Sequence, residues 1–185
     1  MELSRESRPL SPLENLWQHA LRLRWKSERV HVAAVCYRLQ DGEPEFLLVR
    51  TRNGHWTFPK GAVDQDVTHA DAAAREAYEE AGVTGTVEAK PFLSYLHCKP
   101  RQLRSRRGAM LVDAHLCEVK RLVPPLERHR NPTWFSREKA KRRLREMRTP
   151  EYADEVVRVI DRATARILFR HSERSQASKL LKYSR

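Results

Sequence analysis

The chain has few cysteines, no long apolar run and no internal repeat. Its three cysteines, Cys36, Cys98 and Cys117, are widely spaced and form no CxxC pair. This spacing argues against a disulfide framework and a zinc site, and it fits a reducing cytoplasm. No stretch approaches the ~20 apolar residues that cross a bilayer. The first residues also lack the basic-then-apolar pattern of a secretory signal. We therefore expect a cytoplasmic protein without a membrane partner.

Aromatic residues are also scarce, at 8% of the chain. The four tryptophans are scattered and form no stacking motif of the kind that single-stranded nucleic acid usually contacts. Acidic residues are outnumbered, with 24 Asp and Glu against 36 Lys and Arg and a net charge of +12. Such a surface attracts polyanions, unless the charge only keeps the protein in solution. Nucleic acid therefore stays an alternative partner, and a phosphate-rich small molecule is favoured.

With 185 residues, the chain is long enough for one domain that buries about 70% of its unfolded surface. We expect a flexible N-terminus (1–10), a single domain (11–170) and a flexible basic tail (171–185). Hydrophobic periodicity and turn residues predict a mixed α/β layered domain. Strands are predicted near residues 30–39, 45–50, 56–58, 86–97, 108–119 and 133–135; helices are predicted near 11–25, 68–81 and 137–148, and from 150 to about 170.

The segment 68–81 has the features of a short helix that carries three glutamates. Thr68 is a predicted N-cap with Asp71 three positions later, and Gly82 ends the helix. The glutamates at i, i+3 and i+4 fall within an arc of about 100°. Carboxylates this close repel one another unless a cation such as Mg²⁺ or Mn²⁺ binds them, although a solvated acidic face is the alternative. The face expected to pack on a sheet consists of Ala74, Ala77, Tyr78 and Ala81.

The wider spacing around this helix resembles the Nudix box. The pattern is a glycine, then Arg-Glu-aliphatic-x-Glu-Glu-x-Gly-aliphatic fourteen residues later, and the segment Trp56–Gly61 resembles the strand and turn that precede it. The box covers residues 61–83, and the order of elements extends the resemblance to roughly 30–165. The matching residues are Gly61, Arg75, Glu76, Glu79, Glu80, Gly82 and Val83.

This resemblance implies a Nudix-type α/β/α sandwich with a curved mixed sheet, plus N-terminal and C-terminal helices. It also implies a pyrophosphohydrolase that uses Mg²⁺ or Mn²⁺. The implied metal ligands are Glu76, Glu79 and Glu80, with the backbone carbonyl of Lys60 or Gly61. Glu80 is the first choice for the general base and Glu76 the second. Arg75 is expected to brace a carboxylate.

The substrate is expected to be recognised outside the box. The segment 99–107 places five cations between two strands, where they either cradle phosphates or form a solvated loop. These cations, together with the FPKG segment, more weakly resemble the branch that cleaves diadenosine polyphosphates and diphosphoinositol polyphosphates. The predicted substrate-binding residues are Arg50, Arg52, Lys60, Lys99, Arg101, Arg104, Arg106 and Arg107.

One position departs from the box. Val67 stands where the family carries its first glutamate, which helps to hold the metal-binding loop. Asp64 and Asp66 are near enough in sequence to substitute for it. Two alternatives therefore stay open: a pyrophosphohydrolase that acts on the 5′ end of RNA, and a non-catalytic sensor of a phosphate ligand. The oligomeric state stays open too.

Overall fold

The computed structural model describes residues 11, 14, 17, 30–98 and 109–183. The predicted cationic loop and most of the predicted N-terminal helix lie outside these residues. At the start of that helix, the Ser11 N–H donates to Glu14 Oε2 at 2.6 Å and the Glu14 N–H donates to Ser11 Oγ at 3.2 Å. This reciprocal pair is a capping box at the start of the helix predicted near 11–25.

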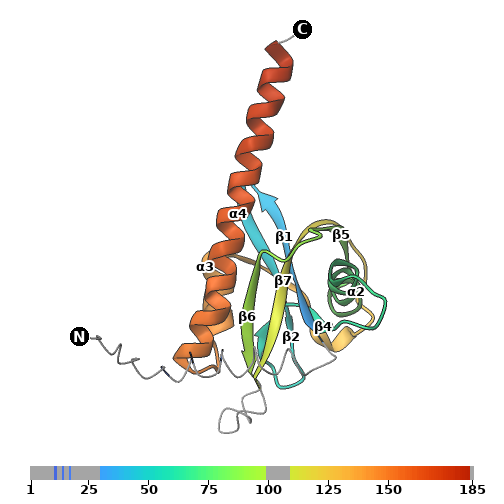
Figure 1. The fold of residues 1–185 in the computed structure, drawn as a ribbon, viewed down its shortest axis with the longest axis vertical. Coiled ribbons are helices and arrows are strands. Elements are labelled where there is room, and N and C mark those ends of the chain that lie inside the picture. Colours follow the sequence, from blue (N-terminus) through green and yellow to red (C-terminus); the bar gives the residue numbers. More distant parts are fainter. Residues whose placement is uncertain (1–10, 12–13, 15–16, 18–29, 99–108, 184–185) are drawn as a thin grey trace, which may run out of the picture.

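A mixed eight-stranded sheet forms the centre of the domain (Figure 1). Its central order is β3-β2-β1-β7-β5, with β4 paired to β1, β6 to β7 and β8 to β2. Only β1 and β7 pair in parallel, and the other pairs between described strands are antiparallel. The strands are β1 (His31–Gln40), β2 (Glu43–Arg50), β3 (Trp56–Thr57), β4 (Lys60–Ala62), β5 (Val83–Val87), β6 (Leu93–Cys98), β7 (Ala109–Leu122) and β8 (Thr133–Ser136).

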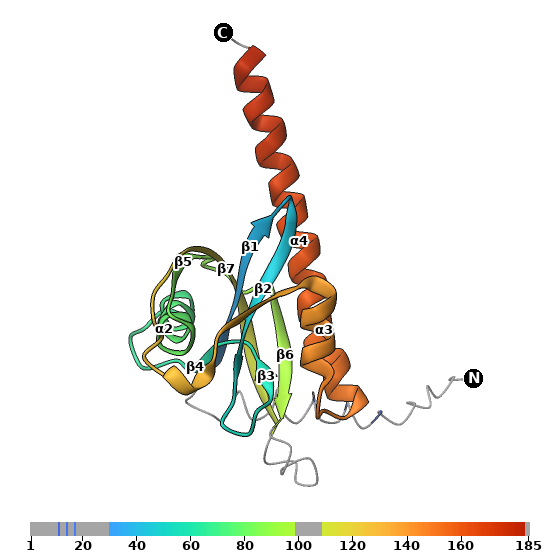
Figure 2. The same ribbon diagram turned by 180° about the vertical axis from the view of Figure 1, so that it is seen from behind.

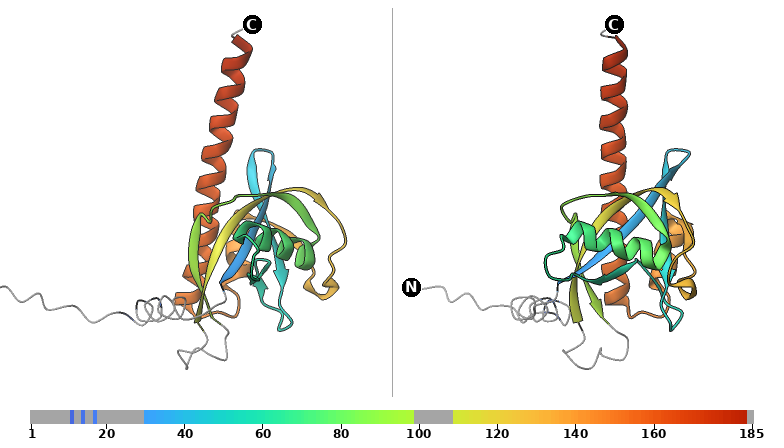
Figure 3. Two further views of the ribbon diagram at one scale, coloured as in Figure 1. Left: turned by 45° about the vertical axis from the view of Figure 1, so that its right-hand side comes forward. Right: turned by 90° about the vertical axis from the view of Figure 1, so that its right-hand side faces the viewer.

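Helices cover both faces of the sheet, which confirms the predicted α/β/α sandwich. Helix α2 (His69–Ala81) lies on one face, and the sheet curves around it (Figure 3). Helices α3 (Arg137–Arg145) and α4 (Pro150–Tyr183) lie on the other face (Figures 1 and 2). A short 3-10 helix, η3 (Arg128–Arg130), leads into β8. No helix among the described residues is long and apolar enough to cross a membrane.

The alternation along β7 divides the interior into two cores. Val112, Ala114 and Leu116 belong to the core under α3 and α4, and Cys117 belongs to the core under α2. The core under α2 contains Ala72, Ala73, Ala77 and Ala81, whose small side chains let the helix lie close to the sheet. The predicted face was partly wrong: Tyr78 is 41% exposed and Ala74 only half-buried. The helix is rotated so that Glu80 borders the core instead.

The C-terminal part differs from the prediction in two ways. Met147 falls within the helix predicted near 137–148, but it follows α3 with a φ of 58° and is 71% exposed. Where a flexible tail was expected from residue 171, α4 continues to Tyr183 and projects beyond the sheet (Figure 1). The segment 151–183 has no glycine or proline, so no residue in it favours an end to the helix.

Candidate active site

The position of α2 is set by its two ends and by β4. Thr68 Oγ1 accepts a hydrogen bond from the Asp71 N–H at 3.1 Å, as expected for the N-cap. Gly82 adopts a left-handed conformation with φ 65°, and its N–H donates to the Tyr78 carbonyl at 2.9 Å. A side chain at Gly82 would also collide with the Val123 carbonyl oxygen, 1.8 Å from an added Cβ. These contacts fix which way the glutamates of α2 face.

Gly61 on β4 makes room for the carboxylate of Glu76. A Cβ added at Gly61 would lie 2.0 Å from Glu76 Oε1. The Glu76 carboxylate therefore lies directly against the β4 backbone, in space that any other residue would fill. Burial raises the pKa of Glu76, and the nearby Glu79 charge raises it further.

Glu80 is the most enclosed of the three glutamates, at 2% exposure. One carboxylate oxygen accepts a hydrogen bond from the Lys60 N–H at 3.3 Å, and the other pairs with Arg130 of η3. Burial raises the pKa of Glu80 to about 7, although the charges of Lys60 and Arg130 oppose the shift. A carboxylate with this pKa can exchange a proton near neutral pH.

Positive charge converges on the same place. Burial lowers the pKa of Lys60 to about 8; Glu80 opposes this shift, and Arg130 and Arg148 add to it. Arg130 also donates to Glu127 Oε2 at 2.6 Å. Arg148 follows α3 and donates to the Trp56 carbonyl at 2.6 Å. Lys60 and Arg130 thus act on the buried carboxylate, and Arg148 acts on Lys60.

The sequence did not predict roles for Glu127, Arg130 and Arg148. They lie 47 to 68 residues after Glu80, in a segment without a motif. The pairing of β8 with β2 brings the segment before β8 back to the site, and the Glu127 N–H donates to the Glu79 carbonyl at 3.0 Å. The one sequence signal was the predicted strand at 133–135, whose partner strand was unknown.

Arg75 braces a carboxylate, as the sequence predicts. Its guanidinium donates to Asp64 Oδ2 at 2.6 Å and to the Ala62 carbonyl at 3.4 Å. Asp64 thereby ties the loop after β4 to α2, whereas Val67 packs against the core under α2. The structure thus shows an acidic residue holding this loop even though the first box glutamate is absent.

The predicted substrate-binding cations are only partly described. Lys60 approaches Glu80, as above. The Arg50 guanidinium lies over the Trp56 ring, 4.6 Å from its centroid, and Arg52 is exposed in the turn between β2 and β3. The cations Lys99, Arg101, Arg104, Arg106 and Arg107 lie outside the described residues.

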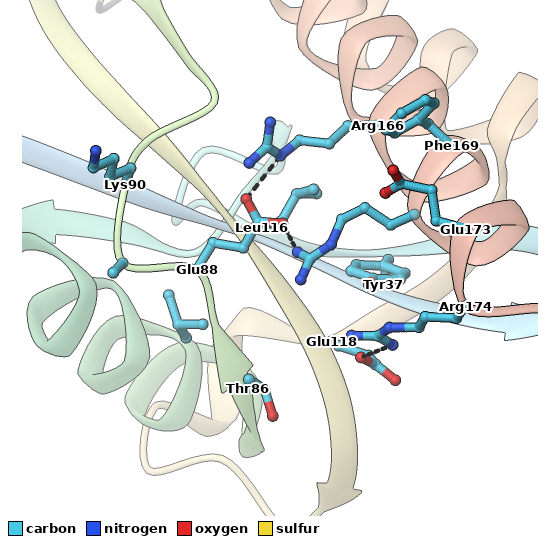
Figure 4. Close-up of a pocket in the computed structure, with 13 residues that line it drawn as sticks. Tyr37, Thr86, Glu88, Lys90, Leu116, Glu118, Arg166, Phe169, Glu173 and Arg174 are labelled. Carbon is cyan, nitrogen blue, oxygen red and sulfur yellow. Dashed lines mark hydrogen bonds and ion pairs between the residues drawn. The ribbon is translucent and has the colours of Figure 1, made fainter. Parts of the chain in front are cut away.

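A separate cavity of about 670 Å³ lies between α4 and the sheet, and none of the predicted site residues lines it (Figure 4).

The donors on α2 suit a hard divalent cation by their chemistry. They are carboxylates on one helix, and burial raises the pKa of Glu76 and of Glu80 by disfavouring their charged forms, which a bound cation would stabilise. In the described part of the chain, no group of three His, Cys, Asp or Glu side chains is placed to hold a metal ion. Arg130 supplies the positive charge at Glu80 instead. The metal-ligand roles of Gly61 and the glutamates stay predictions.

Comparisons with known proteins agree with this arrangement. A family model described as NUDIX domain matches residues 29–157. Nudix hydrolase 18, mitochondrial, from Arabidopsis thaliana is 42% identical over 71 residues, which cover 34% of this chain and 40% of that protein. The matched segment is thus less than half of that relative's length.

Solved structures share the fold. The structure of Caenorhabditis elegans Ap4A hydrolase superposes with a TM-score of 0.55 at 24% identity, over 74% of this chain and 96% of that one. The NUDIX domain of Shewanella oneidensis NrtR, solved with ADP ribose, has a TM-score of 0.56 at 18% identity, over 85% and 99% of the two chains. At these identities the likeness shows the fold alone.

Proposed function

The chain belongs to the NUDIX domain family, and on this premise we propose that it is a magnesium-dependent pyrophosphohydrolase. The reaction is hydrolysis of a phosphoanhydride bond in a phosphate-rich substrate. The observation that carries this proposal is the buried carboxylate of Glu80, whose pKa is raised to about 7 beside Lys60 and Arg130. A base near neutral pH and cations for phosphate oxygens are the groups that this hydrolysis needs.

Glu76, Glu79 and Glu80, with the carbonyl of Gly61, would hold the divalent cation, which supplies charge neutralisation at the bridging phosphates. Glu80 accepts a proton from the attacking water. The water oxygen forms a bond to one phosphorus, and the bond between this phosphorus and the bridging oxygen breaks. The second phosphate leaves with the bridging oxygen. Glu76 is the second choice for this base.

The cations around Glu80 orient the substrate. Lys60 and Arg130 place positive charge for phosphate oxygens beside Glu80, and Arg148 adds positive charge next to Lys60. Arg50 and Arg52 lie just before β3 and extend the positive charge. We favour diadenosine polyphosphates or diphosphoinositol polyphosphates as substrates, because these compounds carry several adjacent phosphates. The fold shared with an Ap4A hydrolase supports that choice.

A second candidate is a non-catalytic sensor of a phosphate ligand. The observation that favours it is the ion pair between Arg130 and Glu80, because a glutamate held by an arginine is less available to a metal or a proton. The pair between Arg75 and Asp64 favours the enzyme, because it holds the loop that Val67 leaves without a glutamate.

The test is a panel of pyrophosphate compounds incubated with the full chain and Mg²⁺. The panel contains diadenosine polyphosphates, diphosphoinositol polyphosphates, ADP-ribose, nucleoside triphosphates and RNA with a 5′ triphosphate or cap. Phosphorus NMR reports which anhydride bond disappears, and EDTA should stop the reaction. Binding without turnover across the whole panel would replace the enzyme with the sensor. Turnover confined to RNA would change the substrate and keep the chemistry.

A further inference from the structure

A row of cations and aromatic rings runs from β3 to α3, next to the candidate active site. We propose that this row, the α3–β3 surface, is a docking surface for a linear chain of inorganic phosphates. This proposal goes beyond the proposed function, because binding of the phosphate chain to the α3–β3 surface does not require Glu80 or turnover. The α3–β3 surface consists of Arg50, Trp56, Phe135, Lys139 and Arg143.

The geometry of the row is defined by ring contacts. The Arg50 guanidinium lies 4.6 Å from the centroid of the Trp56 ring, which meets Phe135 edge-on at 4.9 Å between centroids. On the far side, Lys139 Nζ and the Arg143 guanidinium carbon lie 5.6 Å and 5.9 Å from the Phe135 centroid. The two rings are thus in contact with each other, and three cations lie near them.

Two of these cations have no acidic partner. Among residues 30–98 and 109–183, neither Arg50 nor Lys139 has a carboxylate within ion-pair distance, and both are exposed. Arg143 pairs with Glu146 at 2.7 Å, and its other N–H donors stay available. Arg142 and Arg145 add further exposed cations on α3. An anion can bind here without first breaking the pairs that hold the fold.

The surface continues into the candidate active site. Arg148 joins the two, because it follows α3 and donates to the carbonyl of Trp56. Trp56 in turn lies four residues before Lys60, which approaches Glu80. In the proposed function, Lys60 and Arg130 already provide cations for the phosphates near Glu80. The additional row suits a ligand with phosphates well beyond the reacting bond.

The rings favour a bare phosphate chain over nucleic acid. Proteins that bind single-stranded nucleic acid stack its bases on exposed aromatic rings. Here Trp56 and Phe135 are each only 4% exposed, and cations lie over both rings. The rings are therefore positioned to support the cations and are closed to bases. Figure 2 shows α3 on the side of the sheet away from α2, and α3 is in contact with β3.

The experiment measures binding of long-chain inorganic polyphosphate to the full chain at several salt concentrations. The α3 triple variant carries Lys139→Gln, Arg142→Gln and Arg143→Gln. The matched control carries Lys90→Gln, Arg121→Gln and Arg162→Gln, which remove the same charge from exposed positions on other elements. Thermal unfolding checks that both variants fold.

The α3 triple should bind polyphosphate about tenfold more weakly. The slope of log K against log salt should also shrink by about 2, because each of the lost contacts contributes roughly 0.7 to it. The control should keep both values. Equal losses in the two triples would overturn the proposal, because only net charge would then matter. The proposal would also be overturned, in favour of nucleic acid, if single-stranded RNA bound as tightly as polyphosphate and lost as much affinity in the α3 triple. Glu80→Gln should keep polyphosphate binding, so failure of the proposed hydrolysis leaves this result unchanged.

Discussion

Two clusters of glutamates and arginines in this protein stand in opposite environments. In the first, Glu80 is buried beside Arg130, and burial raises its pKa to about 7. In the second, Arg166, Arg170 and Arg174 of α4 reach the sheet one turn apart, where the first two pair with Glu88 and the third with Glu118 (Figure 4).

The second cluster is more exposed than the first: its three arginine side chains are between 41% and 63% exposed, and the Glu88 and Glu118 side chains are 13% and 28% exposed. A hydrogen bond from Lys120 lowers the pKa of Glu118, which Arg174 lowers further, so this carboxylate stays charged. Charges that are paired in water attach α4 to the sheet. A carboxylate whose charge is opposed by burial can change its protonation or its partner. We therefore infer that burial separates the proposed functional cluster from a structural one that has the same residue types.

The largest expected effect comes from the first cluster. Glu80→Gln should lower hydrolysis about 10²- to 10⁴-fold, because the amide cannot accept the proton of the attacking water. The change also removes the buried partner of Arg130, which keeps its pair with Glu127, so we expect a loss of up to about 3 kcal/mol in unfolding free energy. Initial rates on the best substrate and urea unfolding measure the two quantities.

Glu88→Gln is the matched control. It should keep the rate and lose up to about 1 kcal/mol of stability, as expected for ion pairs near the surface. If Glu88→Gln lost activity, or Glu80→Gln kept it, the two clusters would not differ in role.

A smaller effect is expected from closing the space beside Glu76. In Gly61→Ala, the added Cβ would lie 2.0 Å from Glu76 Oε1, so the carboxylate must move. We expect a loss of about 1–3 kcal/mol in unfolding free energy, typical of overpacking, together with weaker Mg²⁺ binding. Calorimetry measures both. The double variant with Glu76→Ala should recover most of the stability, and strictly additive losses would contradict the proposed clash.

The smallest effect concerns His115, which joins the Glu88 segment to the core. The ring is fully buried, and its Nδ1 lies 2.8 Å from the Glu88 carbonyl oxygen. Burial lowers the pKa of His115; Asp113 opposes this shift and His69 adds to it. The unfolded chain therefore binds the proton first, and stability should fall as the pH drops below about 6.5.

The measurement is urea unfolding at neutral and mildly acidic pH. His115→Gln should show a smaller decrease in unfolding free energy between the two conditions than the parent. Substitution of the exposed His171 by Gln should leave the parent's pH dependence intact. An unchanged pH dependence in His115→Gln would show that this ring is not the group that titrates.

Local features of the fold could be predicted from sequence because their causes are local. Thr68 and Gly82 set the ends of α2 through bonds to residues within five positions. The start of the last helix at residue 150 was also predicted correctly, and Tyr152, Val156 and Ile160 at helical spacing in it are buried. The rotation of α2 could not be predicted, because alanine fits either a buried or a half-buried position, and only the sheet decides between them.

The candidate site shows the same limit. Arg75 was expected to brace a carboxylate, but the choice of Asp64 over Asp66 needed coordinates. Arg130 and Arg148 were not predicted at all, because their approach to Lys60 depends on the pairing of β8 with β2 and on the turn between α3 and α4. No local pattern encodes such distant contacts.

By itself, the sequence determined the glutamate helix, its caps and the glycine before it, because spacing along one helix follows from backbone geometry. It also determined the excess of positive charge, which follows from composition alone. Only the tertiary structure decided which glutamate is buried, which cations meet it and which arginines merely attach α4. Those outcomes depend on desolvation, and a side chain loses its water only when distant parts of the chain close over it.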